Sequence, residues 1–118
     1  EDGHLYPGMC DIPGGNPNTR QFLHETARRL AEKLSFTGEP VPAGVATYVK
    51  TKAEIGISHL FVFRLEEDWP AELPKGCSIF TLDSLPSNLV PWQAWAYPPM
   101  IRRFLIQGPS VLEEYPGE

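Results

Sequence analysis

The sequence is poor in cysteine, with Cys10 and Cys77 alone among 118 residues. These two cysteines form neither a CxxC pair nor a zinc-binding framework, and no cysteine or second histidine is spaced to join His59 on a metal ion. A single disulfide stays open as an alternative. We expect instead that both thiols are buried and reduced, because free cysteine is usually buried and thiols stay reduced inside cells. This implies an intracellular protein, either cytoplasmic or mitochondrial.

The sequence also lacks a signal-peptide pattern, an internal repeat and any hydrophobic run long enough to cross a bilayer. We therefore expect no membrane contact. Basic residues are in the minority, since the net charge is −5 and the isoelectric point is about 5.2. Binding to nucleic acid by bulk electrostatics is disfavoured, because counterion release needs a basic surface.

What the sequence does contain is enough apolar material for one modest domain. Hydrophobic residues make up 42% of the chain, which is sufficient to fill a single core at this length. We assign the domain to residues 1–107 and expect the glycine- and proline-containing tail, residues 108–118, to be loosely ordered. The chain begins with Glu1 rather than Met, which suggests an excised fragment or a processed product.

Hydrophobic periodicity predicts alternating helices and strands. Apolar positions recur at helical spacing over residues 18–34, and residues 45–50 alternate as a strand does. The run at residues 57–65 is apolar on both faces in its middle, as in a central strand covered by helices on each side. A further strand is expected at residues 77–82, and a closing helix at residues 97–107.

The stretch from Asp11 to Phe36 resembles the signature of the Nudix family. That signature has a Gly, five residues, a Glu, seven residues, and then Arg-Glu-U-x-Glu-Glu-x-Gly-U, where U is a bulky aliphatic residue. Counted from Gly14, the positions that agree are Gly14, Arg28, Leu30, Glu32 and, loosely, Phe36. The positions that depart are Arg20, Arg29, Lys33 and Ser35. The flanking segments, residues 6–11 and 45–65, look like the strands beside this signature, so the resemblance spans about the first ninety residues.

The resemblance implies an α/β fold of the Nudix-like α/β/α sandwich type, with a mixed β-sheet. Nudix domains usually place another strand or more before the Pro-Gly-Gly turn, and the short segment before Pro13 leaves little room for it. The first strand is therefore either carried elsewhere in a longer parent chain or missing.

The expected metal chemistry depends on three glutamates, which in the Nudix family lie on one helical face and hold Mg²⁺ against a diphosphate. In this chain Arg29 and Lys33 stand at two of those positions, and only Glu32 remains. Two cations beside the pocket repel a metal ion. We therefore expect no bound metal and no cofactor, with Mg²⁺ required only if the protein is hydrolytically active.

The resemblance favours a catalytically impaired Nudix-fold module that acts in binding or in the assembly of a larger complex. Such degenerate domains occur as subunits of mitochondrial ribosomes and of messenger-RNA processing complexes, so a protein partner in an RNA-associated assembly is a plausible expectation. The alternative is a divergent Nudix pyrophosphohydrolase acting on nucleoside diphosphate derivatives. Its candidate catalytic residues are Glu32, Glu25, Glu66 and Glu67.

A third hypothesis keeps the pocket but reverses its charge. Arg28, Arg29 and Lys33 then grip a nucleotide or diphosphate directly, doing the electrostatic work of the metal without hydrolysis. Beside them, Trp92 and Trp95 are candidates for stacking on a base. Each set of residues also has a simpler interpretation. The cations can instead pair with neighbouring glutamates on a solvated helix face. The tryptophans can instead cover the sheet or pack against a partner.

Overall fold

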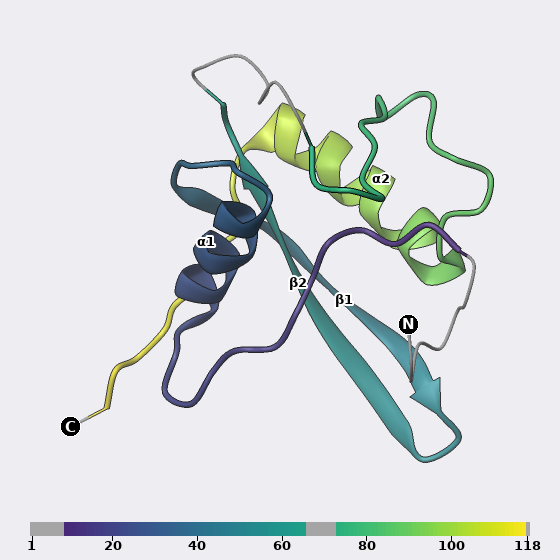
Figure 1. Ribbon diagram of the computed structural model, residues 1–118. Helices are drawn as coiled ribbons and strands as arrows, with labels where there is room; N and C mark the ends of the chain where they lie inside the picture. The colour runs from purple at the N-terminus through teal and green to yellow at the C-terminus, as the bar shows by residue number, and fades with distance from the viewer. Residues whose placement is uncertain (1–8, 66–72, 118) are drawn as a thin grey trace.

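Four regular elements make up the structure, a computed structural model that describes residues 9–65 and 73–117 (Figure 1). In chain order they are helix α1 (Leu23–Lys33), strand β1 (Pro40–Thr51), strand β2 (Glu54–Phe63) and helix α2 (Pro91–Gln107). Two helices with two antiparallel strands confirm the expected α/β class. The mixed sheet implied by the Nudix resemblance is not seen in the described residues, where the sheet consists of β1 and β2.

Strands β1 and β2 form a hairpin whose two faces differ in burial. In the register, Val45 lies opposite His59 and Val49 opposite Ile55. Because successive side chains of a strand point to opposite faces, the pairing sorts the residues into two sets. The outer face carries Val45, Thr47, Val49, Ile55, Ile57 and His59, and the inner face carries Ala46, Tyr48, Gly56 and Ser58. The tip of the hairpin projects away from both helices (Figure 1).

Both strands predicted from the sequence form, with shifted ends. Strand β1 begins at Pro40 rather than Val45, and β2 ends at Phe63 rather than Leu65. The segment expected to be a central strand differs in its surroundings, because among the described residues β2 pairs with β1 alone. The edge of β2 that points away from β1 is therefore open there.

Helix α1 begins later than the predicted helix at residues 18–34. Arg20 has a φ of 61°, a left-handed conformation that an L-residue cannot keep inside a right-handed helix. A separate turn precedes the helix and is closed by the Gln21 N–H, which donates to the Asn18 carbonyl oxygen at 3.0 Å. The helix itself begins after Phe22, whose N–H donates to the Glu25 carboxylate at 2.8 Å.

Helix α1 ends in a Schellman motif, a turn that satisfies its last carbonyl groups. The Ser35 N–H donates to the Glu32 carbonyl and the Phe36 N–H to the Ala31 carbonyl, both at 3.0 Å. The motif needs a left-handed residue, and Ser35 supplies it with a φ of 67°. Glycine takes this conformation without steric cost, and Ser35 stands where the Nudix signature has its second Gly.

Helix α2 begins at Pro91 rather than at Tyr97, so Pro98 and Pro99 lie inside it and not at its start. Pro91 occupies the first helical turn, where a missing N–H costs nothing, whereas the two internal prolines each remove one backbone hydrogen bond. Packing compensates for this loss, because Gln93 and Tyr97 are buried. Neither helix in residues 9–65 and 73–117 is long and apolar enough to span a membrane.

The strand predicted at residues 77–82 does not form. Lys75 and Gly76 make a turn in which Gly76 has a φ of 86°, and most of the residues that follow are exposed. An extended segment without a partner strand has no hydrogen bonds to hold it in a sheet. Cys77 belongs to this exposed segment, so its predicted burial is wrong. Cys10 is half-buried, and both thiols are free.

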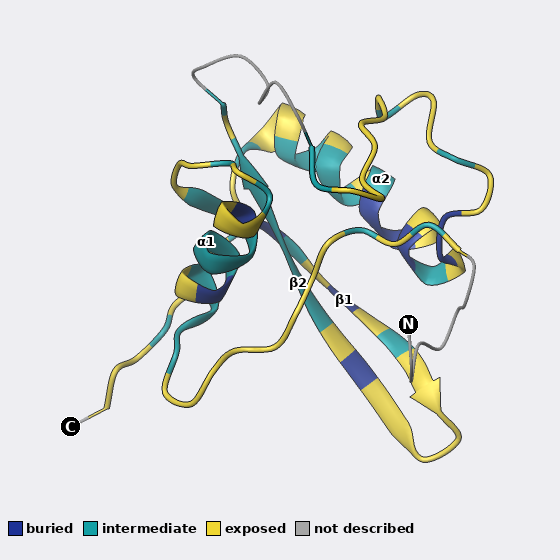
Figure 2. Ribbon diagram, in the orientation of Figure 1, coloured by how far each residue is buried: buried dark blue, intermediate teal, exposed yellow. Residues whose placement is uncertain are grey.

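The core is small and lies mainly between α2 and the inner face of the hairpin. Its buried hydrophobic residues are Ala31, Ala43, Ala46, Leu89, Val90, Ala96 and Tyr97. Gly44 permits the close approach of α2, since a Cβ added there would meet Met100 Cε at 2.7 Å. Much of the hairpin remains outside this core, and its tip is almost entirely exposed (Figure 2).

The described part of the C-terminal tail, residues 108–117, folds back onto the rest of the protein. The Ser110 N–H donates to the Pro42 carbonyl at 2.8 Å, and the Ser110 hydroxyl accepts a hydrogen bond from Arg103 of α2, which also donates to the Ala43 carbonyl at 3.0 Å. Further along, the Glu114 carboxylate accepts a hydrogen bond from the Leu23 N–H at 2.6 Å. The tail thus contacts both the first strand and the N-terminus of α1.

Candidate functional site

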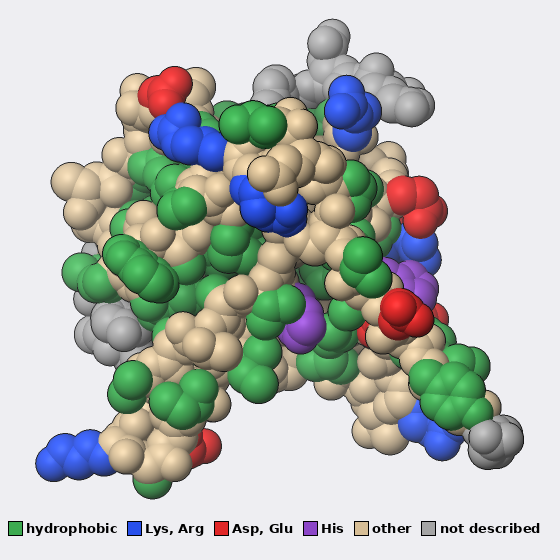
Figure 3. Space-filling model, turned by 180° about the vertical axis from the view of Figure 1, so that it is seen from behind, with side chains coloured by type: hydrophobic (Ala, Val, Ile, Leu, Met, Phe, Trp, Pro, Cys, Tyr) green, Lys and Arg blue, Asp and Glu red, His purple; other side chains and the backbone are tan. Residues whose placement is uncertain are grey.

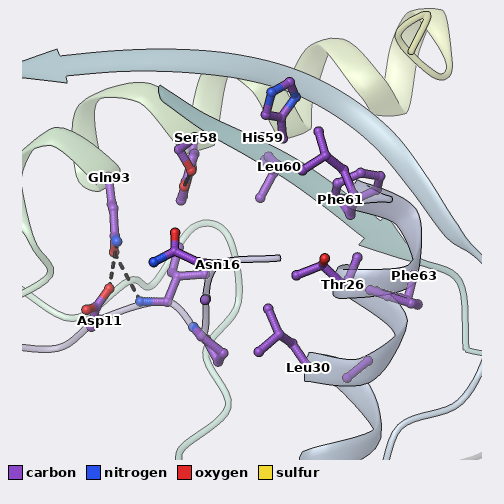
Figure 4. Close-up of a pocket in the computed structure, with 18 of the residues that line it drawn as sticks. Asp11, Asn16, Thr26, Leu30, Ser58, His59, Leu60, Phe61, Phe63 and Gln93 are labelled. Atoms are coloured by element: carbon purple, nitrogen blue, oxygen red, sulfur yellow. Dashed lines mark hydrogen bonds between the residues drawn. The ribbon is translucent and has the colours of Figure 1, made fainter. Parts of the chain in front are cut away.

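A large open cavity, about 1130 Å³ in volume, runs along strand β2. Its other walls are α1, residues 11–17 and the first turns of α2 (Figure 4). In the close-up, Thr26 and Leu30 of α1 lie on one side, Ser58 and Leu60 of β2 on another, and Asn16 between them. We call this cavity the β2 groove.

The β2 groove follows the open edge of the sheet rather than one of its faces. Five consecutive residues of β2, from Ile57 to Phe61, line it, whereas β1 contributes only Tyr48. Since successive side chains alternate between the two faces, a cavity lined by consecutive residues must lie beside the strand. It lies beside the edge that β1 does not cover.

Two apolar walls flank this edge. On one side α1 presents Leu23, Ala27, Leu30 and Leu34, which share one face of the helix through their spacing of three and four residues. On the other side lie Val90, Trp92 and Tyr97, at the beginning of α2. Both of these walls are therefore hydrophobic.

One end of the β2 groove is closed by a polar contact between α2 and the N-terminal segment. Gln93 is buried, and its amide nitrogen donates to the Asp11 carboxylate at 2.6 Å. Its amide oxygen accepts from the Ile12 N–H at 3.0 Å. A buried amide needs such partners, so this pair holds residues 11–12 against α2.

A second polar contact joins the sheet to α2. The hydroxyl groups of Ser58 and Tyr97 are 2.6 Å apart. Burial raises the pKa of the Tyr97 phenol above its ordinary 10.0, while the hydrogen bond with Ser58 acts in the opposite direction. Tyr97 therefore stays protonated at neutral pH, and this contact holds β2 in place without adding charge to the groove.

The two tryptophans predicted to stack on a base lie in different surroundings. Trp92 stacks on Tyr48 with the ring centroids 4.0 Å apart and the planes 6° from parallel. It also meets Tyr97 edge to face at 5.4 Å. Trp92 thus acts as packing between α2 and the hairpin. Trp95 is 80% exposed and does not line the β2 groove.

The three cations predicted to grip phosphate do not line the β2 groove either. Arg28 pairs with the Glu39 carboxylate at 2.9 Å on the surface. Arg29 donates to the Asn16 carbonyl at 2.8 Å, which ties the N-terminal segment to α1, and its Nε is buried without a hydrogen-bond partner. Lys33 is exposed. The apolar face of α1 lines the groove, and the three cations lie on the helix outside that lining.

The predicted catalytic carboxylates are not gathered into a site in the described residues. Glu25 caps the start of α1 through its hydrogen bond with Phe22, and Glu32 is exposed outside the β2 groove. Glu66 and Glu67 lie outside the described residues. Within residues 9–65 and 73–117, no group of three or more His, Cys, Asp or Glu side chains is placed to hold a metal ion.

The polar residues that do shape the groove were not singled out from the sequence. They are Asp11, Ser58 and Gln93. A signal exists for Gln93, because a helix that starts at Pro91 puts Gln93 and Tyr97 four residues apart on one face. No short-range signal links Asp11 or Ser58 to α2.

Comparison with known protein families, with curated proteins and with solved structures found no match to this chain.

Proposed function

We propose that this protein is a non-catalytic, Nudix-like binding module that takes part in a larger intracellular protein assembly through the β2 groove. The observation that carries the proposal is the groove itself. It is large and open, it has two apolar walls, and it follows a strand edge that is unpaired in the described residues. A cavity of this kind suits a hydrophobic partner better than a nucleoside diphosphate, whose charge requires cations or a metal ion.

The conformation of the signature region supports the Nudix-like part of the proposal. Ser35 keeps the left-handed conformation that a glycine would take at the same position of the signature. The turn that ends α1 therefore suits the second glycine of the signature, although the signature's carboxylates have been replaced.

The exposed hydrophobic surface supports the assembly part of the proposal. On the outer face of the hairpin, Val49 is 70% exposed and Ile57 is 66% exposed. Seen from behind, hydrophobic side chains extend over much of the molecule and onto the projecting hairpin, and acidic side chains lie nearer the margins (Figure 3). A two-stranded hairpin is only marginally stable alone, and contiguous apolar surface usually marks an interaction site.

Two measurements on the purified protein test the proposal. The first is hydrolysis of ADP-ribose and of common dinucleotides with Mg²⁺ or Mn²⁺, for which we expect no turnover above the buffer. Turnover that requires metal and is abolished by Glu32→Gln would instead establish the pyrophosphohydrolase, with Glu66 or Glu67 as further ligands to test.

The second measurement is saturable binding of the apolar dye 1-anilinonaphthalene-8-sulfonate. Leu30→Asp places a charge on the α1 wall and should weaken dye binding about tenfold or more, because an unpaired charge is costly in an apolar site. The matched control is Ile106→Asp on α2, which is 83% exposed and does not line the groove. Equal dye binding by the wild type and by Leu30→Asp would show that the groove is not a binding surface.

A further inference from the structure

We infer that the β2 groove binds an extended, apolar peptide segment of a partner protein, which adds to β2 as a third strand. This inference rests on the proposed function and names the class of partner that the groove takes.

The first step is the hydrogen-bonding capacity of the open edge. Each residue of β2 has a backbone N–H and a carbonyl, and β1 can pair with those on one edge only. No backbone hydrogen bond joins residues 12–17, on the opposite side of the groove, to β2. Alternate backbone groups of β2 therefore face the groove, and among residues 9–65 and 73–117 none outside β1 pairs with them, so a strand placed there can bind to them.

The second step is that residues 12–17 are unsuited to fill this role themselves. Pro13 and Pro17 have no N–H to donate. The Ile12 N–H is already bound to Gln93, and the Asn16 carbonyl is bound to Arg29. The segment is therefore fixed to α1 and α2 and leaves the edge of β2 open, with room for a strand between them.

The third step concerns the side chains of the bound segment. Those of a strand added to β2 would point alternately to the two faces of the extended sheet. One face meets the aliphatic wall of α1, with Leu30 at its centre, and the other meets Trp92 and Tyr97. A segment apolar at successive positions fits both walls, whereas an amphipathic strand would bury polar groups against one of them.

The fourth step concerns charge. The two walls of the groove are apolar, and the Asp11 carboxylate that lines one end is already bound to Gln93. The geometry thus points to an apolar extended segment that has no charged group between its ends. A small apolar molecule would use the two walls without the strand edge, which makes the two kinds of ligand distinguishable.

The test uses the full chain and the acetylated, amidated peptide Lys-Val-Val-Thr-Val-Val-Lys. Two isomers of this peptide are N-methylated at alternate residues, one on the even and one on the odd positions. Because alternate N–H groups of a strand point to opposite edges, one isomer blocks the edge that meets β2 and the other blocks the free edge. We expect one isomer to bind at least about tenfold more weakly than the parent peptide, and the other within about threefold.

Amide exchange by NMR provides a second readout that needs no variant. With the parent peptide bound, alternate amides between Ile57 and Phe63 should exchange at least about tenfold more slowly, because only those facing the groove gain a partner. Leu30→Asp, checked for folding by circular dichroism, should weaken peptide binding, and Ile106→Asp should not.

The failures of the two proposals are separable. If the two N-methylated isomers bind equally, or if β2 shows no alternating protection, strand addition is wrong. Saturable dye binding that depends on Leu30 would then still support the groove as a binding site for a small apolar ligand. If neither the peptide nor the dye binds in a manner that depends on Leu30, both the inference and the proposed function are wrong.

Discussion

The ring of Tyr48 lies directly over Gly56, its cross-strand partner in the hairpin. A Cβ added at Gly56 would lie 2.3 Å from Cζ of that ring, closer than any real contact. The same ring is stacked on Trp92 of α2. The absence of a side chain at Gly56 therefore allows the hairpin and α2 to be joined by one aromatic stack.

Replacing Gly56 should break this stack. Gly56→Ala forces Tyr48 away from its position and should reduce the free energy of unfolding by about 1–3 kcal/mol, as other overpacked sites do. Urea unfolding followed by tryptophan fluorescence measures the change. The matched control is Gly14→Ala, where an added Cβ meets only the Ile12 carbonyl oxygen at 3.8 Å. An equal loss in both variants would mean that the contact with Tyr48 is not the cause.

Ser35 is a position where the native residue is strained. Ser35→Gly should raise the free energy of unfolding by about 0.5–1 kcal/mol, because glycine adopts the left-handed conformation of the Schellman motif without steric cost. Thr37→Gly is the control, since Thr37 is exposed and has no positive φ. It should lose about 0.5 kcal/mol through added flexibility of the unfolded chain. Thermal unfolding of the two variants that shifts in the same direction would contradict this account.

The tail contributes a cap to α1 that depends on pH. Glu114 accepts from the Leu23 N–H at 2.6 Å and lies 3.0 Å from His24 Nδ1. Burial raises the pKa of the Glu114 carboxyl, but these contacts and the His24 N–H outweigh it and hold the pKa below its ordinary 4.5. The unfolded chain then binds the proton more tightly, so the stabilisation is present above pH 4.5 and is lost as the pH falls through the folded pKa.

Glu114→Gln should therefore matter near neutral pH and not in acid. We expect the variant to lose about 1 kcal/mol of unfolding free energy near neutral pH, the usual worth of a charged N-terminal cap. At a pH well below 4.5 the difference from the wild type should vanish. The neighbouring Glu113→Gln is the control, because Glu113 is exposed. A difference that stays constant across this range would show that the charge of Glu114 is not involved.

Magnesium should find no specific site on this protein. Glu32 is exposed and stands beside Lys33, and a hard divalent cation needs several oxygen ligands. Calorimetry should show no saturable binding below about 1 mM Mg²⁺, and Glu32→Gln should leave the weak response unchanged. A single saturable site at lower concentration that disappears in Glu32→Gln would revive the hydrolase.

The sequence by itself determined the elements whose pattern is local. Alternation of apolar residues predicted the strand at residues 45–50, and a run that is apolar on both faces predicted the strand at residues 57–65. Helical spacing predicted α1. Each of these signals lies within a few residues of the backbone it describes. The ends of these elements were harder to predict from the sequence. The left-handed Arg20 shortens α1, and no residue type in its neighbourhood requires that conformation.

Tertiary structure alone decided where α2 begins and that residues 77–82 form no strand. Considered with their neighbours alone, the prolines at positions 98 and 99 predict the start of a helix. In the structure the helix begins at Pro91, and its buried face includes Gln93 and Tyr97. Residues 77–82 have the composition of a strand, but a strand also needs a neighbour, and the chain places none beside them in the described residues.

The candidate site depended on tertiary structure to the greatest degree. The contact between Asp11 and Gln93 joins residues 82 positions apart, and that between Ser58 and Tyr97 joins residues 39 apart. Periodicity reports which side of an element is apolar, but it does not report which other element covers that side. The cations and carboxylates of the signature could be found by counting residues. Their position outside the groove follows only from how α1 is turned toward β2, and packing of the whole chain sets that rotation.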